Sequence, residues 1–473
     1  MKQRLITVLC MLLVAAAFLT ACGNKENTTE KTPTTSAQTQ GQYQDLVPAK
    51  DIDRNITILT DFAPSMDIHE TSGDPVWDVE VEMYLLAEQK YNVSIQYQAP
   101  AAGRAFATLE MLRDSDAHEF DLLYSPHPTY GIYSLITSGT MVDLHSVESL
   151  DLNGEWYNQS QVENHTSNGK LFLCVPDFTI QGQGLSSYVY NTQYYAALGF
   201  EEDLYQVVRD GGWTMDKLLT IVQEASTSSD GANQSYALCF WRNTAGNLNS
   251  SNILVKNEDD QFELGLNANK LTTVVDKAKS LLSQDGVLVN ESYNAGFADT
   301  EIWKAFSAGR GLFLTAEVGQ TDVSQYLRTL EFDINYLPVP KASEIDDYRA
   351  GTASGFCGIP AIAYDKEESG LLMECMAVYG YEKLKPTFFN KILEGRLAKE
   401  AADFEMLDFL HSIKTFDFGF TFDDENKMRA MMDTLVFGES GGLGGKQAVS
   451  AYLMANDAYI KNLVDKANAI GKD

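Results

Sequence analysis

Residues 56–60 (ITILT), 93–97 (VSIQY) and 120–124 (FDLLY) are three short runs rich in β-branched and apolar side chains. Two stretches with helical patterning, residues 79–91 and 105–113, separate them. Runs of this length and composition predict strands, and the stretches between them predict helices. Because strands that alternate with helices form βαβ units, this part of the chain predicts a mainly parallel sheet and an α/β fold.

The same alternation returns further along the chain. Helices are predicted over residues 213–225, 272–283 and 301–308, and strands over residues 236–240 (YALCF) and 311–315 (GLFLT); the part after residue 365 is predicted to be mostly helical. About 420 residues belong to this α/β region, which is enough for two lobes rather than a single core.

The N-terminal segment is typical of an exported protein. Lys2 and Arg4 precede residues 5–19, which are nearly all apolar, and small residues follow. This pattern predicts a secretory signal peptide, because so short an apolar run is not long enough to cross a bilayer comfortably. Residues 23–50 are rich in Thr, Gln, Asn, Ser and Lys, so they predict a flexible tether.

The chain is strongly acidic. Its formal net charge is -31, which becomes -33 once Lys2 and Arg4 are removed with the signal peptide. So negative a surface argues against a nucleic-acid partner and against the capture of anions by the general field of the protein. A local basic pocket is compatible with this charge.

The cysteines and histidines show no spacing typical of a metal site. Cys174, Cys239, Cys357 and Cys375 are widely separated and form neither a CxxC pair nor a dense disulfide framework. They predict buried free thiols, with an extracellular disulfide as the alternative. The sequence has no HExxH, and near Asp116 the glycine and terminal glutamate of an EF-hand loop are missing. We therefore expect neither a metal nor another cofactor.

Leu19, Thr20, Ala21 and Cys22 close the apolar N-terminal segment. They resemble the lipobox of bacterial lipoproteins, in which the cysteine becomes the new N-terminus and carries a diacylglyceryl group. The resemblance implies a signal peptide over residues 1–21, and a lipidated Cys22 followed by the tether to residue 50. The protein would then be held on the extracytoplasmic face of the cell membrane, since two acyl chains anchor a protein stably. The alternative is an ordinary signal peptide in which Cys22 has no special role.

Six phrases occur in a fixed order along the chain: GTMVDL (139–144), NGKLFLCVP (168–176), VYN (189–191), GGWT (211–214), AFSAGRGLFL (305–314) and YLPVPK (336–341). Together they resemble the extracellular solute-binding proteins of ABC importers, specifically family 1, the carbohydrate type that includes maltose-binding-like proteins. No single phrase is specific, and the resemblance rests on their order.

This resemblance implies a two-lobed, periplasmic-binding-protein-like fold of type II, with hinge strands and a ligand cleft between the lobes. The implied N-terminal lobe comprises residues 51–176 and 358–418, and the C-terminal lobe residues 180–355 and 420–473. The implied crossings between the lobes lie near residues 176–184, 352–358 and 418–422.

Trp241, Arg242 and Asn243 directly follow the predicted strand YALCF. Ligands of open α/β sheets bind beyond the carboxyl ends of the strands, so these three residues lie where a ligand is expected. An indole, a guanidinium and an amide together suit the apolar faces and polar edges of a sugar ring. The alternative is that Trp241 packs inside a lobe.

Other candidate ligand-binding residues lie at equivalent strand ends and at the first crossing. They are Asp61 and Phe62 after ITILT, Ser125 and His127 after FDLLY, Trp77 at a helix entry, Asp177 and Phe178 at the crossing, and Glu317 after GLFLT. The alternative for Trp77 is an apolar contact at the start of its helix. Trp213 and Trp303 are predicted to be structural. Residues 316–320 contain no aromatic side chain, whereas many sugar-binding relatives carry one there.

These features predict a monomeric binding protein without catalytic residues. It would capture a small extracellular solute, in the first place a sugar or oligosaccharide, and deliver it to the permease subunits of an ABC transporter. The alternative is a secreted, surface-anchored hydrolase acting on carbohydrate, for which the sequence offers neither a GxSxG elbow nor an HExxH helix. An adhesin would show β-repeats or long stalks rather than alternating strands and helices.

Overall fold

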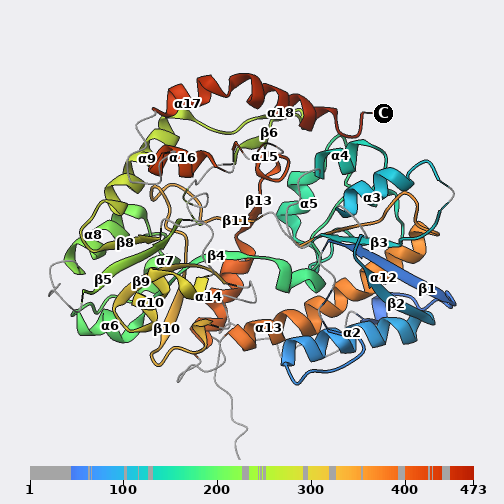
Figure 1. The fold of residues 1–473 in the computed structure, drawn as a ribbon, viewed down its shortest axis with the longest axis horizontal. Helices are drawn as coiled ribbons and strands as arrows, with labels where there is room; N and C mark the ends of the chain where they lie inside the picture. Colours follow the sequence, from blue (N-terminus) through green and yellow to red (C-terminus); the bar gives the residue numbers. More distant parts are fainter. Residues whose placement is uncertain are drawn as a thin grey trace, which may run out of the picture. The chain divides into compact units, whose positions relative to one another are not determined.

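The computed structural model describes most of the chain after residue 43, and the described residues belong to one compact unit, Tyr43–Asp473 (Figure 1). They are residues 44–61, 64, 66–100, 104–115, 117–125, 132–225, 234–242, 244, 248, 252–290, 297–318, 326–352, 355–392, 400–423, 425, 427–428, 430–438 and 448–472. The predicted signal peptide, Cys22, Phe62, His127 and Asn243 lie outside them. Across these ranges, no helix is both long enough and apolar enough to span a bilayer.

The first sheet has four strands and confirms the predicted βαβ pattern. β1 (Arg54–Thr60) pairs in parallel with β2 (Val93–Gln98) and β3 (Leu122–Ser125), and β12 (Phe356–Gly358) adds an antiparallel edge, giving the order β12-β3-β1-β2. α2 (Pro75–Tyr91) connects β1 to β2, and α3 (Ala105–Leu112) precedes β3. The carboxyl ends of the three parallel strands therefore lie at one edge of this sheet.

Local capping sets the start of α2. The carboxylate of Asp74 accepts hydrogen bonds from the backbone N–H groups of Val76 and Trp77 at 3.0 and 3.2 Å, and Pro75 takes the first helical position. At the other end, Asn92 adopts the left-handed conformation, with φ 52°. The helix begins before residue 79, where the apolar pattern predicted it, because the N-cap and the proline decide its first turn.

The second sheet has five strands in the order β10-β4-β9-β5-β8. β5 (Tyr236–Trp241) is parallel to its neighbours β8 (Val287–Asn290) and β9 (Gly311–Val318). β4 (Leu185–Asn191) is antiparallel to β9 and to β10 (Ile334–Pro338). Three helices pack against it and confirm the predicted helical regions within a few residues: α8 (Met215–Ala225), α9 (Ala268–Leu282) and α10 (Glu301–Ser307).

The part after residue 365 is mostly helical, as predicted. α12 (Lys366–Tyr379) is buried along most of its length and continues through a π-helical turn, η8 (Gly380–Leu384), into α13 (Lys385–Ile392). α14 (Ala401–Ser412) and α18 (Asp457–Ala469) are of similar length to α12. The remaining elements are short: η1 (Gln44–Leu46), α4 (Ile132–Thr137), η2 (Leu144–Ser146), α5 (Gln159–His165), α6 (Thr192–Ala197), α7 (Leu204–Arg209), β6 (Leu254–Lys256), β7 (Phe262–Leu264), η7 (Phe297–Asp299), α15 (Phe418–Thr421), α16 (Met431–Phe437) and α17 (Val449–Ala455).

Short segments lead from one sheet to the other. η3 (Asp177–Gly182) precedes β4, and β11 (Ala350–Thr352) precedes β12 and pairs in parallel with β13 (Lys414–Phe416). The predicted lobe boundaries stay predictions. However, α14 packs against β10 and β4, and Tyr205 of α7 donates a hydrogen bond to Asp403 of α14 at 2.9 Å. These contacts favour counting α14 with the second sheet rather than with the N-terminal lobe.

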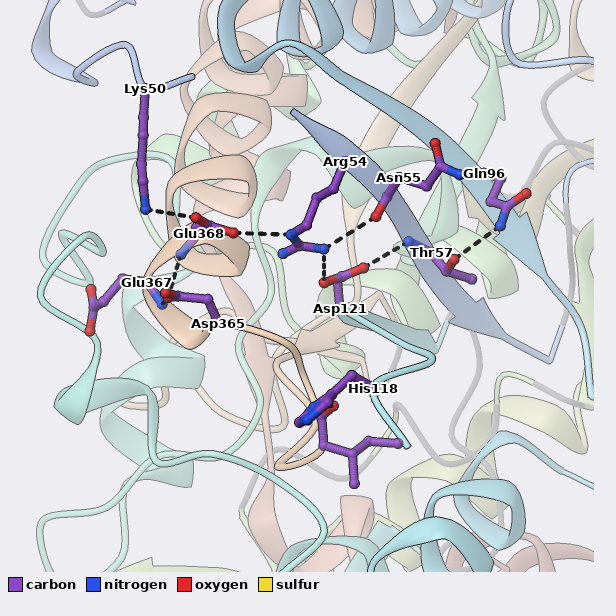
Figure 2. Close-up of polar contacts among 11 residues, drawn as sticks. Lys50, Arg54, Asn55, Thr57, Gln96, His118, Asp121, Asp365, Glu367 and Glu368 are labelled. Atoms are coloured by element: carbon purple, nitrogen blue, oxygen red, sulfur yellow. Dashed lines mark hydrogen bonds and ion pairs between the residues drawn. The ribbon is translucent and has the colours of Figure 1, made fainter. Parts of the chain in front are cut away.

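A cluster of ion pairs fixes the start of β1 (Figure 2). Arg54 donates to Asp121 at 2.6 Å and to Glu368 of α12 at 3.0 Å, and Lys50 Nζ lies 2.8 Å from the same Glu368 carboxylate. The second oxygen of Asp121 accepts the backbone N–H of Thr57 at 2.9 Å. Because Arg54, Asp121 and Glu368 are mostly shielded from water, their ion pairs tie β1 to α12 more firmly than exposed pairs would. This cluster occupies the amino end of β1, away from the edge where a ligand is expected.

Candidate functional site

The carboxyl edge of the second sheet carries the main candidate site. Because β5, β8 and β9 are parallel, their last residues lie at one edge (Figure 1). Trp241 is the last residue of β5, and its backbone N–H donates to Thr315 Oγ1 of β9 at 2.7 Å. Glu317 lies further along β9, in register with Ser186 of β4. Two of the predicted residues, Trp241 and Glu317, are thus brought to this edge.

Four rings that we call the aromatic cluster gather there: Trp241, Phe297, Trp303 and Tyr326. The ring centroid of Phe297 lies 5.4 Å from that of Trp241, 5.4 Å from that of Trp303 and 6.2 Å from that of Tyr326. Phe297 and Trp303 are buried, whereas Trp241 and Tyr326 are partly exposed. The indole Nε1 of Trp241 is buried and finds no hydrogen-bond partner within the described residues. The cluster therefore combines partly exposed rings with one buried N–H donor that lacks a partner within the described residues.

Sequence reasoning missed two members of this cluster. Residues 316–320 contain no aromatic side chain, but Tyr326, further along the chain, contacts the rings of Phe297 and Trp303. Phe297 follows β8, whose role at this edge the sequence did not indicate. A signal was present for Phe297, which follows the short β-branched run VLVN (287–290). Trp303 lies in α10 and its side chain is buried, as predicted, although its ring also contacts that of Tyr326.

Arg242 is engaged by another part of the protein. Its Nε lies 2.5 Å from Asp433 Oδ1 and its Nη2 lies 2.7 Å from Asp433 Oδ2, a bidentate pair with α16. The guanidinium also lies over the ring of Phe437, 4.9 Å from its centroid. Arg242 is only 8% exposed. This environment favours a structural role, so the ligand contact predicted for Arg242 is weakened.

At the carboxyl edge of the first sheet, three predicted residues take part in local structure. Asp61 follows β1 and accepts the N–H of Ala105 at 2.8 Å, which caps the start of α3. Trp77 donates its indole N–H to the carbonyl of Glu70 at 2.8 Å. Ser125, the last residue of β3, is buried beside β12. Their roles as ligand contacts stay predictions.

A buried polar group surrounds the crossover segment η3. Asp177 Oδ1 lies 3.5 Å from His411 Nε2, and Asp177 Oδ2 lies 3.8 Å from Lys385 Nζ. Lys414 donates to Gln183 Oε1 at 2.9 Å. Burial lowers the pKa of His411 to about 3, and burial lowers the pKa of Lys414 to about 7, partly offset by Asp177. The predicted residue Asp177 therefore belongs to a network that joins η3 to the C-terminal part of the chain.

Phe178 and Glu80 both contact the region of η3. Phe178 is buried, and a Cβ at Gly380 would overlap its backbone, so Phe178 packs in the core under η8. Glu80 of α2, which sequence reasoning missed, is hydrogen-bonded to Gln181 of η3. Burial raises the pKa of Glu80 to about 7, and the hydrogen bond only partly opposes this rise. Glu80 is thus a carboxyl group that gains and loses its proton near neutral pH.

The thiols of Cys174, Cys239, Cys357 and Cys375 are buried and form no disulfide bond. Cys174 pairs with Cys357 of β12 through an isolated antiparallel bridge, with two backbone hydrogen bonds of 2.8 Å between them. As for metals, in the ranges given above no three His, Cys, Asp or Glu side chains are grouped as ligands.

No family sequence profile and no curated protein matches the chain. Solved structures match it over nearly its whole length. One is a family 1 extracellular solute-binding protein from Bifidobacterium longum subsp. infantis, at 14% identity, covering 87% of this chain and 98% of that chain with a TM-score of 0.51. The chain has the fold of the extracellular solute-binding proteins.

Two further structures with the solute-binding-protein fold are similar over the same length. The GacH receptor of Streptomyces glaucescens, solved unliganded and with acarbose, is 12% identical and covers 88% of this chain and 99% of its own, with a TM-score of 0.55. UgpB from Mycobacterium tuberculosis, solved with glycerophosphocholine, is 14% identical and covers 87% and 98%, with a TM-score of 0.54. The predicted two-lobed, periplasmic-binding-protein-like α/β fold is therefore confirmed.

Proposed function

We propose that this protein is the substrate-binding component of an ABC transporter and captures a small polyhydroxylated solute between its two lobes. The observation that carries the proposal is the likeness of fold over 87% of this chain and 98% of a family 1 solute-binding protein. Similar folds were solved with acarbose in GacH and with cycloalternan in the protein Lmo0181 from Listeria monocytogenes. Both ligands are oligosaccharides, so a sugar or oligosaccharide is the first class to test.

The aromatic cluster is the proposed ligand platform of the C-terminal lobe. The partly exposed rings of Trp241 and Tyr326 suit the apolar faces of a sugar, and the unsatisfied indole N–H of Trp241 suits a hydroxyl oxygen. Glu80 and Gln181 are the proposed polar groups nearest the crossover. This arrangement pairs ring platforms with hydrogen-bonding groups, as carbohydrate sites require.

The proposal includes export and anchoring. The basic and apolar N-terminal residues, with Cys22 after them, support a lipoprotein held on the extracytoplasmic face of the membrane. A tether ending near residue 50 would leave the lobes free to meet the permease subunits of the transporter. The N-terminal lobe proposed here contains the first sheet, and the C-terminal lobe contains the second sheet together with α14.

Thermal unfolding of the mature domain against a panel of mono- and oligosaccharides tests the binding function. A binding protein shows a melting temperature that rises with the concentration of one ligand class, because the ligand stabilises the folded state by mass action. The panel includes glycerophosphocholine and is followed by product analysis. Release of cleaved products would instead favour the hydrolase, and a panel without any shift in melting temperature would count against the proposed ligand class.

Two matched tryptophan substitutions test the platform once a ligand is found. Trp241→Phe keeps a ring but removes an N–H that has no partner within the described residues, so affinity should fall while stability is retained. Trp213→Phe is the control, because Trp213 is fully buried and donates to the carbonyl of Pro338 at 2.8 Å. That change should lower stability and leave affinity unchanged. Trp241→Ala should weaken binding several-fold, since an aromatic contact contributes about 0.5–1.5 kcal/mol beyond area burial. If Trp241→Ala left the affinity unchanged and greatly lowered the melting temperature, Trp241 would be a core residue and not part of the ligand site.

A further inference from the structure

A cavity lies where α7 and α14 pack beside β10, and no member of the aromatic cluster lines it. Its volume is about 330 Å³, within the range of about 300–1,000 Å³ common for small-molecule sites. The walls come from α7, from α14 and from the loop that follows β10. None of the predicted ligand residues lines it.

Lys341 lines this cavity and carries a buried charge. It is 6% exposed, and its ammonium Nζ donates to the carbonyl of Glu344 at 2.8 Å and lies 4.9 Å from the ring centroid of Tyr348. Within the described ranges no carboxylate lies at ion-pair distance from this ammonium. A buried charge is costly unless an opposite charge compensates it, and one carbonyl and one ring face are only partial compensation. The site therefore favours an anionic group beside Lys341.

The backbone around Lys341 is arranged so that its ammonium faces the cavity. Gly211, which also lines the cavity, has φ +74°, and a Cβ there would lie 3.3 Å from Lys341 Nζ. Only glycine both adopts this backbone conformation easily and leaves that space open. The backbone N–H of Lys341 donates to the carbonyl of Trp213 at 3.1 Å, which fixes the base of its side chain. The ammonium is thus held among lining residues rather than reaching solvent.

The remaining wall near Lys341 is apolar and firmly positioned. Tyr348 and Phe409 form a T-shaped pair with ring centroids 5.7 Å apart, and Trp213 donates its backbone N–H to the Tyr348 hydroxyl at 3.0 Å. Val208 and Met406, both buried or nearly so, complete this wall. A flat or branched apolar group would bury its surface here without rearranging the protein.

The other charged side chains that line the cavity are more exposed than Lys341. Arg209 pairs with Glu405 at 3.3 Å, and both are exposed. Asp346 is held by Lys270 at 2.5 Å. Asp347 is exposed, so water and salt screen its charge. The one charge in this cavity that is both buried and without an opposite partner in the described residues is the Lys341 ammonium.

We propose that this cavity binds a small organic carboxylate with an apolar body. The carboxylate would pair with the Lys341 ammonium, and the apolar body would lie against Tyr348, Phe409 and Met406. The site is separate from the proposed solute cleft and does not depend on it.

Isothermal titration of the mature domain with 3-phenylpropanoate tests this proposal. Its neutral analogue 3-phenylpropanamide has the same shape and is the first control. We expect the carboxylate to bind with a dissociation constant of about 1 mM or tighter, and the amide at least tenfold more weakly. Equal binding of acid and amide, or no heat from either at about 10 mM, would overturn the proposal.

Lys341→Met then removes the ammonium and keeps most of the side-chain volume. It should weaken binding of 3-phenylpropanoate at least tenfold. Lys217→Met is the matched control, because Lys217 pairs with Glu202 and does not line the cavity. Retained binding in Lys341→Met would refute the assigned anion partner. Solute binding at the cleft should be unchanged in Lys341→Met and reduced in Trp241→Ala, so failure of one site is distinguishable from failure of the other.

Discussion

Replacing Arg242 by methionine separates a structural role from a ligand-binding one. In the folded protein both ends of the guanidinium fork pair with Asp433, at 2.5 and 2.7 Å, and Arg242 is 8% exposed. Methionine keeps much of the apolar contact with Phe437 but leaves the Asp433 carboxylate without its partner. Breaking a buried ion pair in this way costs about 3–5 kcal/mol. Because the Asp433 side chain is still 17% exposed, water reaches it, and we expect a loss of about 3 kcal/mol, near the lower end.

The assay is urea unfolding of the mature domain, followed by tryptophan fluorescence, with a double-mutant cycle. Asp433→Leu alone should also be destabilising, whereas Arg242→Met with Asp433→Leu should recover much of the loss, because no uncompensated charge remains. Affinity for the solute should change little in the double variant. The reasoning fails if Arg242→Met keeps its stability and loses solute binding, since Arg242 would then be a ligand group, as its position after β5 predicted.

Three further predictions concern other parts of the chain. Burial raises the pKa of Glu374 from 4.5 to about 7. Between pH 4.5 and pH 7 the carboxyl group therefore keeps its proton in the native state and loses it in the unfolded state. As a result, this group lowers the stability of the wild-type protein as the pH rises from 4.5 to 7. Glu80 titrates in the same window, so Glu374→Gln should remove only the Glu374 share of this dependence, a relative gain of up to about 3 kcal/mol at pH 7 over pH 4.5, measured by unfolding both proteins at both values. Ellman's reagent should find no reactive thiol in the native Cys22→Ala domain and four after unfolding; two would indicate a disulfide between Cys174 and Cys357, whose backbones are paired. In cells, Cys22→Ala should abolish labelling by radioactive fatty acid and release the protein from the membrane, and persistent labelling would contradict a lipoprotein.

The strands and most helices could be predicted because their patterns are local. The runs ITILT and FDLLY consist mainly of β-branched and apolar residues, and nearly all of their residues in β1 and β3 are buried, as in strands covered on both faces. Boundaries were less predictable. The first turn of α2 depends on a carboxylate cap and a proline. A prediction based on the spacing of apolar residues takes neither of them into account. The contacts of α14 with β10 could not be foreseen, because they join parts of the chain that are far apart in sequence.

The position of the candidate site could be predicted from the sequence, but several of the residues that form it could not. Parallel strands bring their carboxyl ends together, and that rule is enough to bring Trp241 to the edge of the second sheet. Phe297 and Tyr326 arrive there from two other loops, and the sequence around each does not say which way the ring will turn. Glu80 lies inside a helix, where a carboxyl group is ordinarily a solvated surface group. Its contact with Gln181 depends on where the chain crosses between the sheets.

The candidate residues at these strand ends differ in whether their polar groups already have hydrogen-bond partners inside the protein. Arg242 is paired twice with Asp433, Asp61 caps α3, and the indole N–H of Trp77 is used by the carbonyl of Glu70. A side chain engaged in this way would have to break a contact inside the protein before binding a ligand, which costs about as much as the new contact contributes. The indole N–H of Trp241 differs, because it is buried and meets no acceptor within the described residues. A ligand oxygen placed there adds a hydrogen bond without breaking one. A position at the carboxyl edge of a sheet therefore makes a residue a candidate for ligand binding. Trp241 is the strongest of these candidates, because its indole N–H has no hydrogen-bond acceptor within the described residues.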